Sequence, residues 1–230
     1  MEKAQRLISL DILRGITIAG MIIVNNPGSW KHIYTPLKHA IWNGLTPTDL
    51  VFPFFMFIMG ISTYISLKKF NFTYSQPLVK KVIKRTILLF LIGLFINWCA
   101  KGMCSYQELR IPGVLQRLAL CYFFTVILCT NIHEKYIPAL ITALLVIYQI
   151  ILMTGNGFVY GSQNIIAIVD QSILGTSHLY NDHGIDPEGI LSTIPSIAHT
   201  LIGYYIGKIC IGKEDIHSKL EKLFLIGTLI

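Results

Sequence analysis

The sequence predicts an all-α protein, a polytopic transmembrane helical bundle that forms one domain over residues 1–230. Three observations carry this prediction: 53% of the residues are hydrophobic, only 13% are charged, and the mean hydropathy is +0.59. Soluble domains carry about 25% charged residues, and disordered chains are poor in apolar ones. The composition therefore excludes a water-soluble globule and a disordered chain.

Uncharged runs give the expected spans in chain order. Six of them lie at residues 15–30, 50–67, 86–100, 118–132, the first half of 136–169, and 189–207. Several are shorter than the roughly 20 residues that cross a bilayer, and flanking charges such as Arg14, Lys101 and Arg117 extend them by reaching to the interface. Residues 223–230 begin a seventh span, so we expect the N-terminal part of a longer domain.

Lysine and arginine gather in alternate connections, which predicts the orientation. They occupy the N-terminal segment, the connection at 68–85 and the segment after the sixth run. The positive-inside rule then places the N-terminus in the cytoplasm and the loops at 26–49, 101–113 and 155–188 on the far side. We interpret the basic connection, in a chain of net charge +7, as a topology signal that faces anionic lipid, not as a nucleic-acid site.

The first far-side loop groups several residues that could do chemistry, namely Asn25, His39, Trp42 and Asp49. Each also has a plain structural interpretation. A tryptophan often lies at the membrane interface, a loop histidine is often a bystander, and Asp49 is suited to stabilise a helix N-terminus. Composition alone leaves both interpretations open.

The third far-side loop is acidic and contains no lysine or arginine between residues 155 and 188. Its His178, Asp186 and Glu188 suggest two alternatives. The carboxylates could hold a cationic sugar amine or act as acid and base, or the DPEG segment could cap the helix that follows. The residues alone do not decide between them.

Charges at membrane depth are the remaining candidates. Asp11 and Arg14 share one helix face and form either an interfacial ion pair or part of a site, whereas snorkelling alone could explain Arg117. Five cysteines show no metal-ligand spacing, and Cys99 and Cys104 could form a disulfide. We therefore expect no metal.

Four blocks in one order resemble the heparan-α-glucosaminide N-acetyltransferase family of transmembrane acyltransferases, including its bacterial relatives. These blocks are SLDILRG, KHAIWNGLTPTDLVFPFFMFIMG, RIPGVLQRLAL, and DQSILGTSHLY followed by DPEGILSTIPSI. The resemblance covers residues 6 to about 208. The resemblance implies an enzyme of the bacterial inner membrane that moves an acetyl group from cytosolic acetyl-CoA to the amine of a terminal glucosamine across the bilayer.

The resemblance also assigns residues. The family's active histidine precedes WNG and matches His39, and its asparagine at the end of the first span maps to Asn25, with Asn26 adjacent. His39 would serve as a base, since imidazole exchanges protons near neutral pH, or as an acetyl carrier. Asn25 could donate to the developing oxyanion, and Asp49 could orient His39 or bind the acceptor ammonium.

Further expectations concern ligands and partners. Arg14 and Arg117 are candidates for contacts with CoA, because guanidinium pairs well with phosphate. The expected contacts of the amino-sugar or glycan acceptor are Trp42, Asn43, His178, Asp186 and Glu188. A homodimer is a further expectation, and the alternative function is a transporter of an amino sugar or related solute, which needs no thioester.

Overall fold

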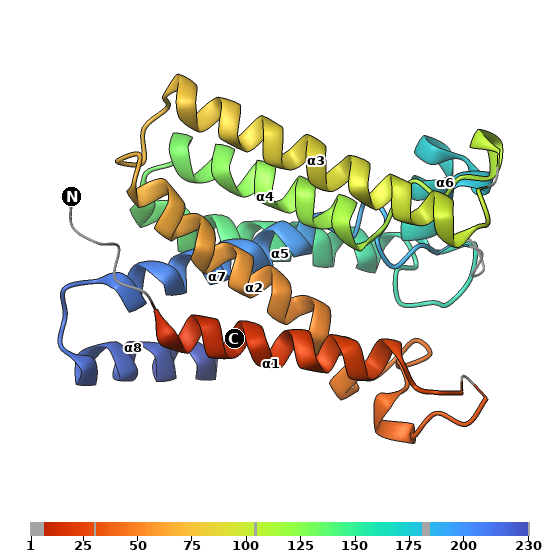
Figure 1. Ribbon diagram of the computed structural model, residues 1–230, viewed down its shortest axis with the longest axis horizontal. Helices are drawn as coiled ribbons and strands as arrows, with labels where there is room; N and C mark the ends of the chain where they lie inside the picture. The colour runs from red at the N-terminus through yellow and green to blue at the C-terminus, as the bar shows by residue number, and fades with distance from the viewer. Residues whose placement is uncertain (1–6, 30, 104, 181–184, 230) are drawn as a thin grey trace.

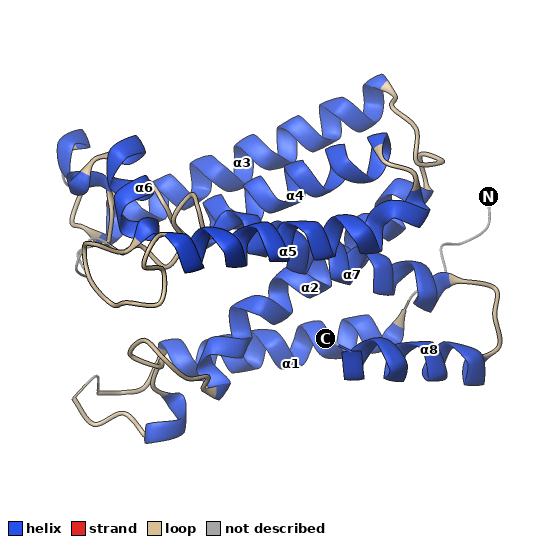
Figure 2. Cartoon of the chain, turned by 180° about the vertical axis from the view of Figure 1, so that it is seen from behind, coloured by secondary structure: helices blue, strands red, loops and turns tan. Residues whose placement is uncertain are grey.

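The computed structural model describes residues 7–29, 31–103, 105–180 and 185–229, and within these ranges it contains helices and loops but no strand (Figure 2). Eight α-helices are described: α1 (Ile8–Asn25), α2 (Pro47–Lys68), α3 (Gln76–Ala100), α4 (Val114–Asn131), α5 (Ile137–Thr154), α6 (Ile165–Leu174), α7 (Thr193–Ile211) and α8 (Ile216–Leu229). Short 3₁₀ turns lie in the connections: η1 (Thr35–Leu37), η2 (Tyr106–Glu108), η3 (Glu134–Tyr136) and η4 (Thr176–His178). The all-α fold class is confirmed for the described residues.

The long helices run back and forth along one axis, so their connections gather at two ends (Figure 1). The connections after α1, α3 and α5 lie together at one end, which we call the loop end. Those after α2, α4 and α7 lie at the other end, which we call the basic end. The expected grouping of the three loops is thereby confirmed, whereas the side of the membrane that each end faces stays a prediction.

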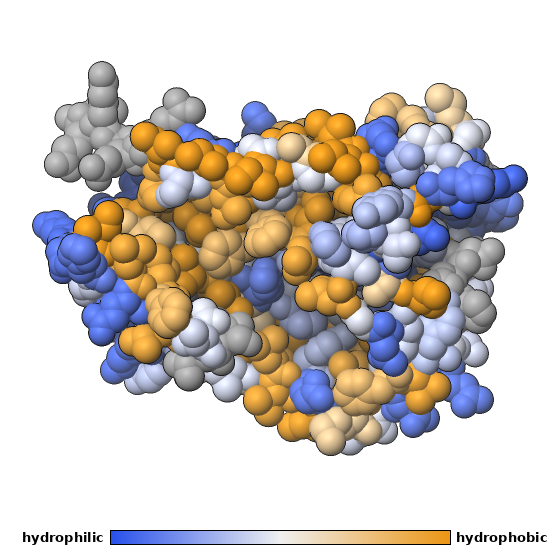
Figure 3. Space-filling view, turned by 90° about the horizontal axis from the view of Figure 1, so that it is seen from below, coloured by the Kyte–Doolittle hydropathy of each residue, from blue (hydrophilic) through white to orange (hydrophobic). Residues whose placement is uncertain are grey.

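Five helices, α1 to α5, are long and apolar enough to cross a membrane when η3 is counted with α5. Hydrophobic residues cover much of the middle of one face, and hydrophilic ones gather toward its two ends (Figure 3). This distribution is that of an integral multi-pass membrane protein. The expected sixth span, α7, is not among the five, and polar residues such as Ser196, His199 and Lys208 lie within it. The count of six spans and the start of a seventh stays a prediction.

Several helices begin earlier than the uncharged runs suggest. The run 15–30 predicts a first span that is displaced from α1, which starts at Ile8 and ends at Asn25. The helix continues through its two charged residues because Arg14 donates to Asp11 and to Ser62 of α2, both at 3.3 Å. In the same way α3 extends the run 86–100 back to Gln76, where the Ser75 side chain caps its first turn.

The second half of the run 136–169 forms a separate short helix, α6, which the sequence analysis does not predict. Asn164 causes the break. Its buried side chain accepts the N–H of Ile166 and donates to the carbonyls of Gly157 and Val159, at 2.8 to 2.9 Å. One amide thus satisfies both the start of α6 and the turn before it.

The centre of the bundle is the crossing of α2 with α7, where glycines allow the two backbones to touch. A Cβ atom on Gly60 would lie 2.1 Å from the Thr200 carbonyl oxygen, and one on Gly203 would lie 2.2 Å from that of Phe57. Small residues are what let membrane helices approach closely. Around this crossing pack the buried Met56, Met59, Leu201 and Tyr204.

We expect Gly60→Ala to lower the free energy of unfolding by about 1–3 kcal/mol, because the added methyl must push α2 and α7 apart. Thermal unfolding in detergent measures this. The matched control is Gly15→Ala on α1, where a Cβ would meet no atom within 4 Å. Equal unfolding temperatures for the two variants would contradict the proposed role of the crossing.

Candidate active site

His39 and Asp49 form a hydrogen-bonded pair at the loop end. The His39 Nδ1 lies 2.6 Å from Asp49 Oδ1. His39 follows η1 in the loop after α1, and Asp49 lies in the first turn of α2. The histidine side chain is 74% exposed and the carboxylate 23%. The pair therefore joins a partly shielded anion to an imidazole that solutes can reach.

The second oxygen of Asp49 fixes the carboxylate in place. Oδ2 accepts the Thr46 hydroxyl at 2.8 Å, the Thr46 N–H at 2.9 Å and the Ala40 N–H at 3.3 Å. The Asp49 N–H in turn donates to the Thr46 carbonyl, which closes a reciprocal cap at the start of α2. Asp49 thus combines both interpretations left open above, because one oxygen caps the helix while the other holds His39.

Trp42 ties the histidine loop to the connection between α5 and α6. Its indole N–H donates to the Phe158 carbonyl at 2.8 Å, and its ring packs against Tyr160 with centroids 5.2 Å apart. The polar edge of Trp42 is therefore already bonded and its ring already packs on Tyr160, so its contact with an acceptor stays a prediction. The neighbouring Asn43 is exposed.

Asn25 ends α1 at the same end of the bundle but does not bond to the His39–Asp49 pair. Its side-chain amide donates to the Met21 carbonyl at 2.9 Å, and that of Asn26 donates to Ile22 at 2.8 Å. Both asparagines are exposed. The structure thus leaves the role of Asn25 a prediction.

A second charged cluster surrounds Arg110, a residue that the sequence analysis does not place in the site. Arg110 donates to both oxygens of Asp186, at 2.6 and 3.0 Å, and also to Glu188. Its guanidinium lies 4.9 Å from the ring centroid of Tyr180. Burial would lower the pKa of Arg110, but the hydrogen bonds and charges of Asp186 and Glu188 raise it above its ordinary value.

Asp186 and Glu188 therefore already hold a cation of the protein itself. An acceptor ammonium bound by Asp186 and Glu188 would compete with Arg110. The role of these two carboxylates in binding the acceptor therefore stays a prediction, and their ion pairs with Arg110 argue against it. The Asp186 carboxylate also accepts the N–H groups of Tyr180 and Glu188. The sequence signal for Arg110 was present but weak: it is one of two cations in the loop at 101–113.

His178 joins the second and third far-side loops. Its Nδ1 lies 2.7 Å from the Leu109 carbonyl, its own carbonyl accepts the Ile111 N–H at 2.9 Å, and its ring packs against Tyr106. These contacts are those of a residue that holds loops together. The expected pair of Cys99 with Cys104 lies outside the described residues, because Cys104 is not described.

The two arginines expected to contact CoA lie in different places. Arg117, in the first turn of α4 at the loop end, is buried and donates to the Gly189 carbonyl and the Ser192 hydroxyl. Arg14, in the second turn of α1 and nearer the basic end, is partly exposed and bonds Asp11 and Ser62. Contacts of either arginine with CoA stay a prediction.

A family model described as the catalytic part of heparan-alpha-glucosaminide N-acetyltransferase matches residues 6–229. The chain belongs to this family. Curated relatives are the heparan-alpha-glucosaminide N-acetyltransferases of Mus musculus and Homo sapiens. They are 31% identical over 269 aligned residues and 32% identical over 264, covering 93% and 89% of the chain. The chain spans about two fifths of their length, 40% and 38%.

In this member of the acetyltransferase family, Asp170 of α6 anchors the turn that carries Asp186 and Glu188. Its side chain is fully buried, and Oδ1 accepts the N–H groups of Ile190 and Leu191 at 2.8 and 3.3 Å. Oδ2 has no hydrogen-bond partner among the described residues and packs against Gly189, where a Cβ would lie 1.7 Å away. Burial raises the pKa of Asp170 above its ordinary 3.8, against the lowering effect of the two N–H bonds.

We expect Asp170→Asn to gain stability relative to the unmodified protein as the pH rises from about 4 to 7. The folded-state pKa of Asp170 exceeds its unfolded value, so its contribution to stability is complete at acidic pH and is lost as the pH rises through the folded pKa. The amide of the variant does not titrate. Unfolding temperatures measured in detergent across this range test the trend, and a gap between the two proteins that does not change with pH would contradict it.

Proposed function

We propose that the protein is a membrane acetyltransferase that moves an acetyl group from acetyl-CoA to the amine of a glucosamine-type sugar. One observation carries the proposal: the exposed His39 ring is oriented through Nδ1 by the fixed Asp49 carboxylate. The family membership and the names of the curated relatives support the same class of reaction.

The geometry suits His39 to accept a proton. An ionised Asp49 can only accept hydrogen bonds, so it selects the tautomer of His39 that carries a proton on Nδ1. The lone pair of Nε2 then points away from Asp49, and Nε2 has no hydrogen-bond partner among the described residues. A nitrogen held in this way is a general base for the acceptor amine.

In direct transfer the amine nitrogen attacks the thioester carbon while Nε2 takes the proton from nitrogen. The C–S bond breaks, the sulfur leaves as the CoA thiolate, and an amide remains. In the alternative route Nε2 attacks the thioester carbon first, the C–S bond breaks, the CoA thiolate leaves, and the acetyl group is held as an acyl-imidazole. The amine then attacks the acetyl carbon, the bond from that carbon to Nε2 breaks, and the released imidazole takes the amine proton. In either route Asp49 stabilises the positive charge that develops on the ring.

The other expected residues take supporting roles in this proposal. Asn25 would turn its amide from the Met21 carbonyl toward the developing oxyanion. The ring of Trp42 and the side chain of Asn43, both beside His39 in sequence, would contact the sugar. Arg14 and Arg117 would bind the CoA moiety. We place the N-terminus in the cytoplasm of a bacterial cell, with the acceptor across the inner membrane.

We expect His39→Ala to lower acetyl transfer by about 10²–10⁴-fold, which is the usual contribution of a positioned general base. The assay follows label from radiolabelled acetyl-CoA to glucosamine, in membranes that contain the protein. His32→Ala is the matched control, because His32 is a second exposed histidine of the same loop with no side-chain bond to Asp49. Normal turnover by His39→Ala would contradict the assignment.

Label incubated with the membranes in the absence of acceptor separates the two routes. If labelled acetyl stays bound to the unmodified protein but not to His39→Ala, the carrier route is indicated. If the protein binds no label and CoA is released only when acceptor is present, direct transfer is indicated. Failure of the unmodified protein to transfer acetyl to any of a panel of amino sugars and glycans would instead favour the transporter alternative.

A further inference from the structure

The connection between α2 and α3 forms an uncompensated cationic surface at the basic end. Six cations lie there, namely Lys68, Lys69, Lys80, Lys81, Lys84 and Arg85, and all are exposed. The sequence contains no aspartate or glutamate from residue 50 to residue 107. Glu134, which belongs to the same end of the bundle, is paired with Lys208 at 3.2 Å. We call this set of six cations the α2–α3 corner.

Two of the six cations are held by the protein itself. Lys81 donates to the Ser66 hydroxyl at 2.8 Å, and the guanidinium of Arg85 lies 4.4 Å from the ring centroid of Tyr122. The structure gives no partner among the described residues to Lys68, Lys69, Lys80 or Lys84. The surface therefore presents four free ammonium groups, arranged around two anchored ones.

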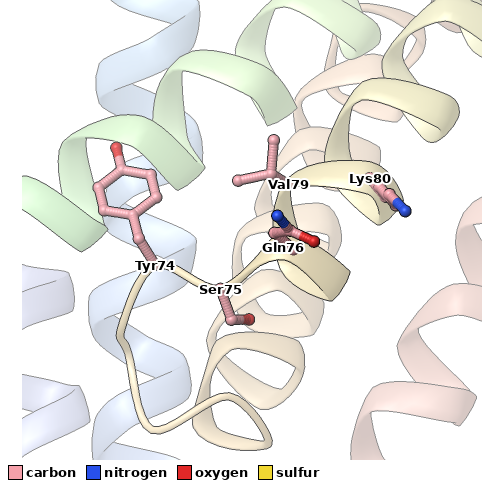
Figure 4. A pocket seen from close by; sticks show the side chains of 5 residues that line it. All are labelled: Tyr74, Ser75, Gln76, Val79 and Lys80. Atoms are coloured by element: carbon pink, nitrogen blue, oxygen red, sulfur yellow. The ribbon is translucent and has the colours of Figure 1, made fainter.

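An open groove of about 440 Å³ lies at this corner, against the first turns of α3 (Figure 4). Its lining is mixed: Tyr74 and Val79 supply apolar surface, whereas Ser75, Gln76 and Lys80 supply polar groups. The Tyr74 hydroxyl accepts a hydrogen bond from Asn131 of α4 at 2.6 Å, which fixes that wall of the groove. The groove thus offers apolar contact beside hydrogen-bond donors and a cation.

The exposed face of α3 continues from the cations into a hydrophobic stripe. Ile83, Ile87 and Leu91 follow at helical spacing and are 45%, 51% and 55% exposed. Lys80 comes one turn before the stripe and Lys84 lies between Ile83 and Ile87, both at helical spacing and therefore on the same side of α3. A ligand that fits both parts has an anionic head and a long apolar tail.

We propose that the α2–α3 corner is a binding site for an anionic phospholipid. The phosphate of the lipid lies among Lys80, Lys84 and the neighbouring cations, and its acyl chains lie along the exposed face of α3. Charge complementarity favours an anionic headgroup over a zwitterionic one. The hydrophobic stripe belongs to a helix that is long and apolar enough to cross a membrane, so the acyl chains of a lipid held at the cations would continue along it within the bilayer.

The test uses the whole chain in detergent, equilibrated with vesicles of phosphatidylcholine alone or of phosphatidylcholine and phosphatidylglycerol in equal amounts. Native mass spectrometry then counts the retained lipid. We expect phosphatidylglycerol to be retained in preference to phosphatidylcholine. The double variant Lys80→Gln with Lys84→Gln should reduce its retention by about tenfold or more, since each surface cation contributes substantially to binding anionic lipid.

The matched control is Lys135→Gln with Lys213→Gln, which removes two cations from the same end of the bundle. Lys135 lies in η3 and Lys213 lies between α7 and α8, so both are outside the α2–α3 corner. The control should retain phosphatidylglycerol. A third variant, Lys80→Arg with Lys84→Arg, preserves the charge and should also retain the lipid, which distinguishes lost binding from a general loss of folding.

Three results would overturn the proposal. The first is equal retention of phosphatidylcholine and phosphatidylglycerol by the unmodified chain. The second is an equal loss of lipid in the control and in the test variant. The third is displacement of the lipid by added acetyl-CoA, which would assign these cations to the acyl donor.

Discussion

The backbone contact between α2 and α7 sets the positions of the two helices that adjoin the charged clusters of the loop end. Gly60 and Gly203 let the two helices touch where any side chain would separate them. The first turn of α2 carries Asp49, and α7 begins a few residues after the turn that holds Asp186 and Glu188. The crossing therefore sets the relative position of α2, which carries Asp49, and α7, which follows the turn with Asp186 and Glu188. Because α7 also packs on α4 and α5, the crossing reaches the remaining helices of the bundle.

At the loop end, most charged groups are satisfied internally. Arg110 holds two carboxylates, Arg117 binds a carbonyl and a hydroxyl, and Asp170 binds two backbone N–H groups. Such bonding fixes the loops, because breaking one partner leaves a buried charge uncompensated. His39 differs, since it has one firm partner and one exposed nitrogen. Arg117 Nε and Asp170 Oδ2 also lack a hydrogen-bond partner among the described residues, but both atoms are buried, whereas the His39 ring is exposed to solutes.

Local features were predictable from the sequence and distant pairings were not. The apolar runs located the long helices, and Asp49 signalled the start of α2. Asp49 is only ten residues from His39, within reach of a short loop. Arg110 and Asp186, by contrast, are 76 residues apart, and no periodicity relates them. The start of α6 was hidden because the run 136–169 is uncharged throughout, and the buried Asn164 amide that begins the helix adds no charge to mark the break.

The loop after α1 is hydrogen-bonded to the rest of the bundle mainly through its C-terminal half. From Ala40 onward it is bonded to Asp49, and Trp42 fastens it to Phe158. The stretch from Pro27 to η1 makes no comparable bond to the rest of the bundle within its described residues. Sequence changes should therefore be tolerated unequally. Insertions before η1 would lengthen a loop segment that is not bonded to the bundle and would leave the His39 imidazole in place. A single residue inserted between His39 and Trp42 would instead shift the imidazole away from the Asp49 carboxylate.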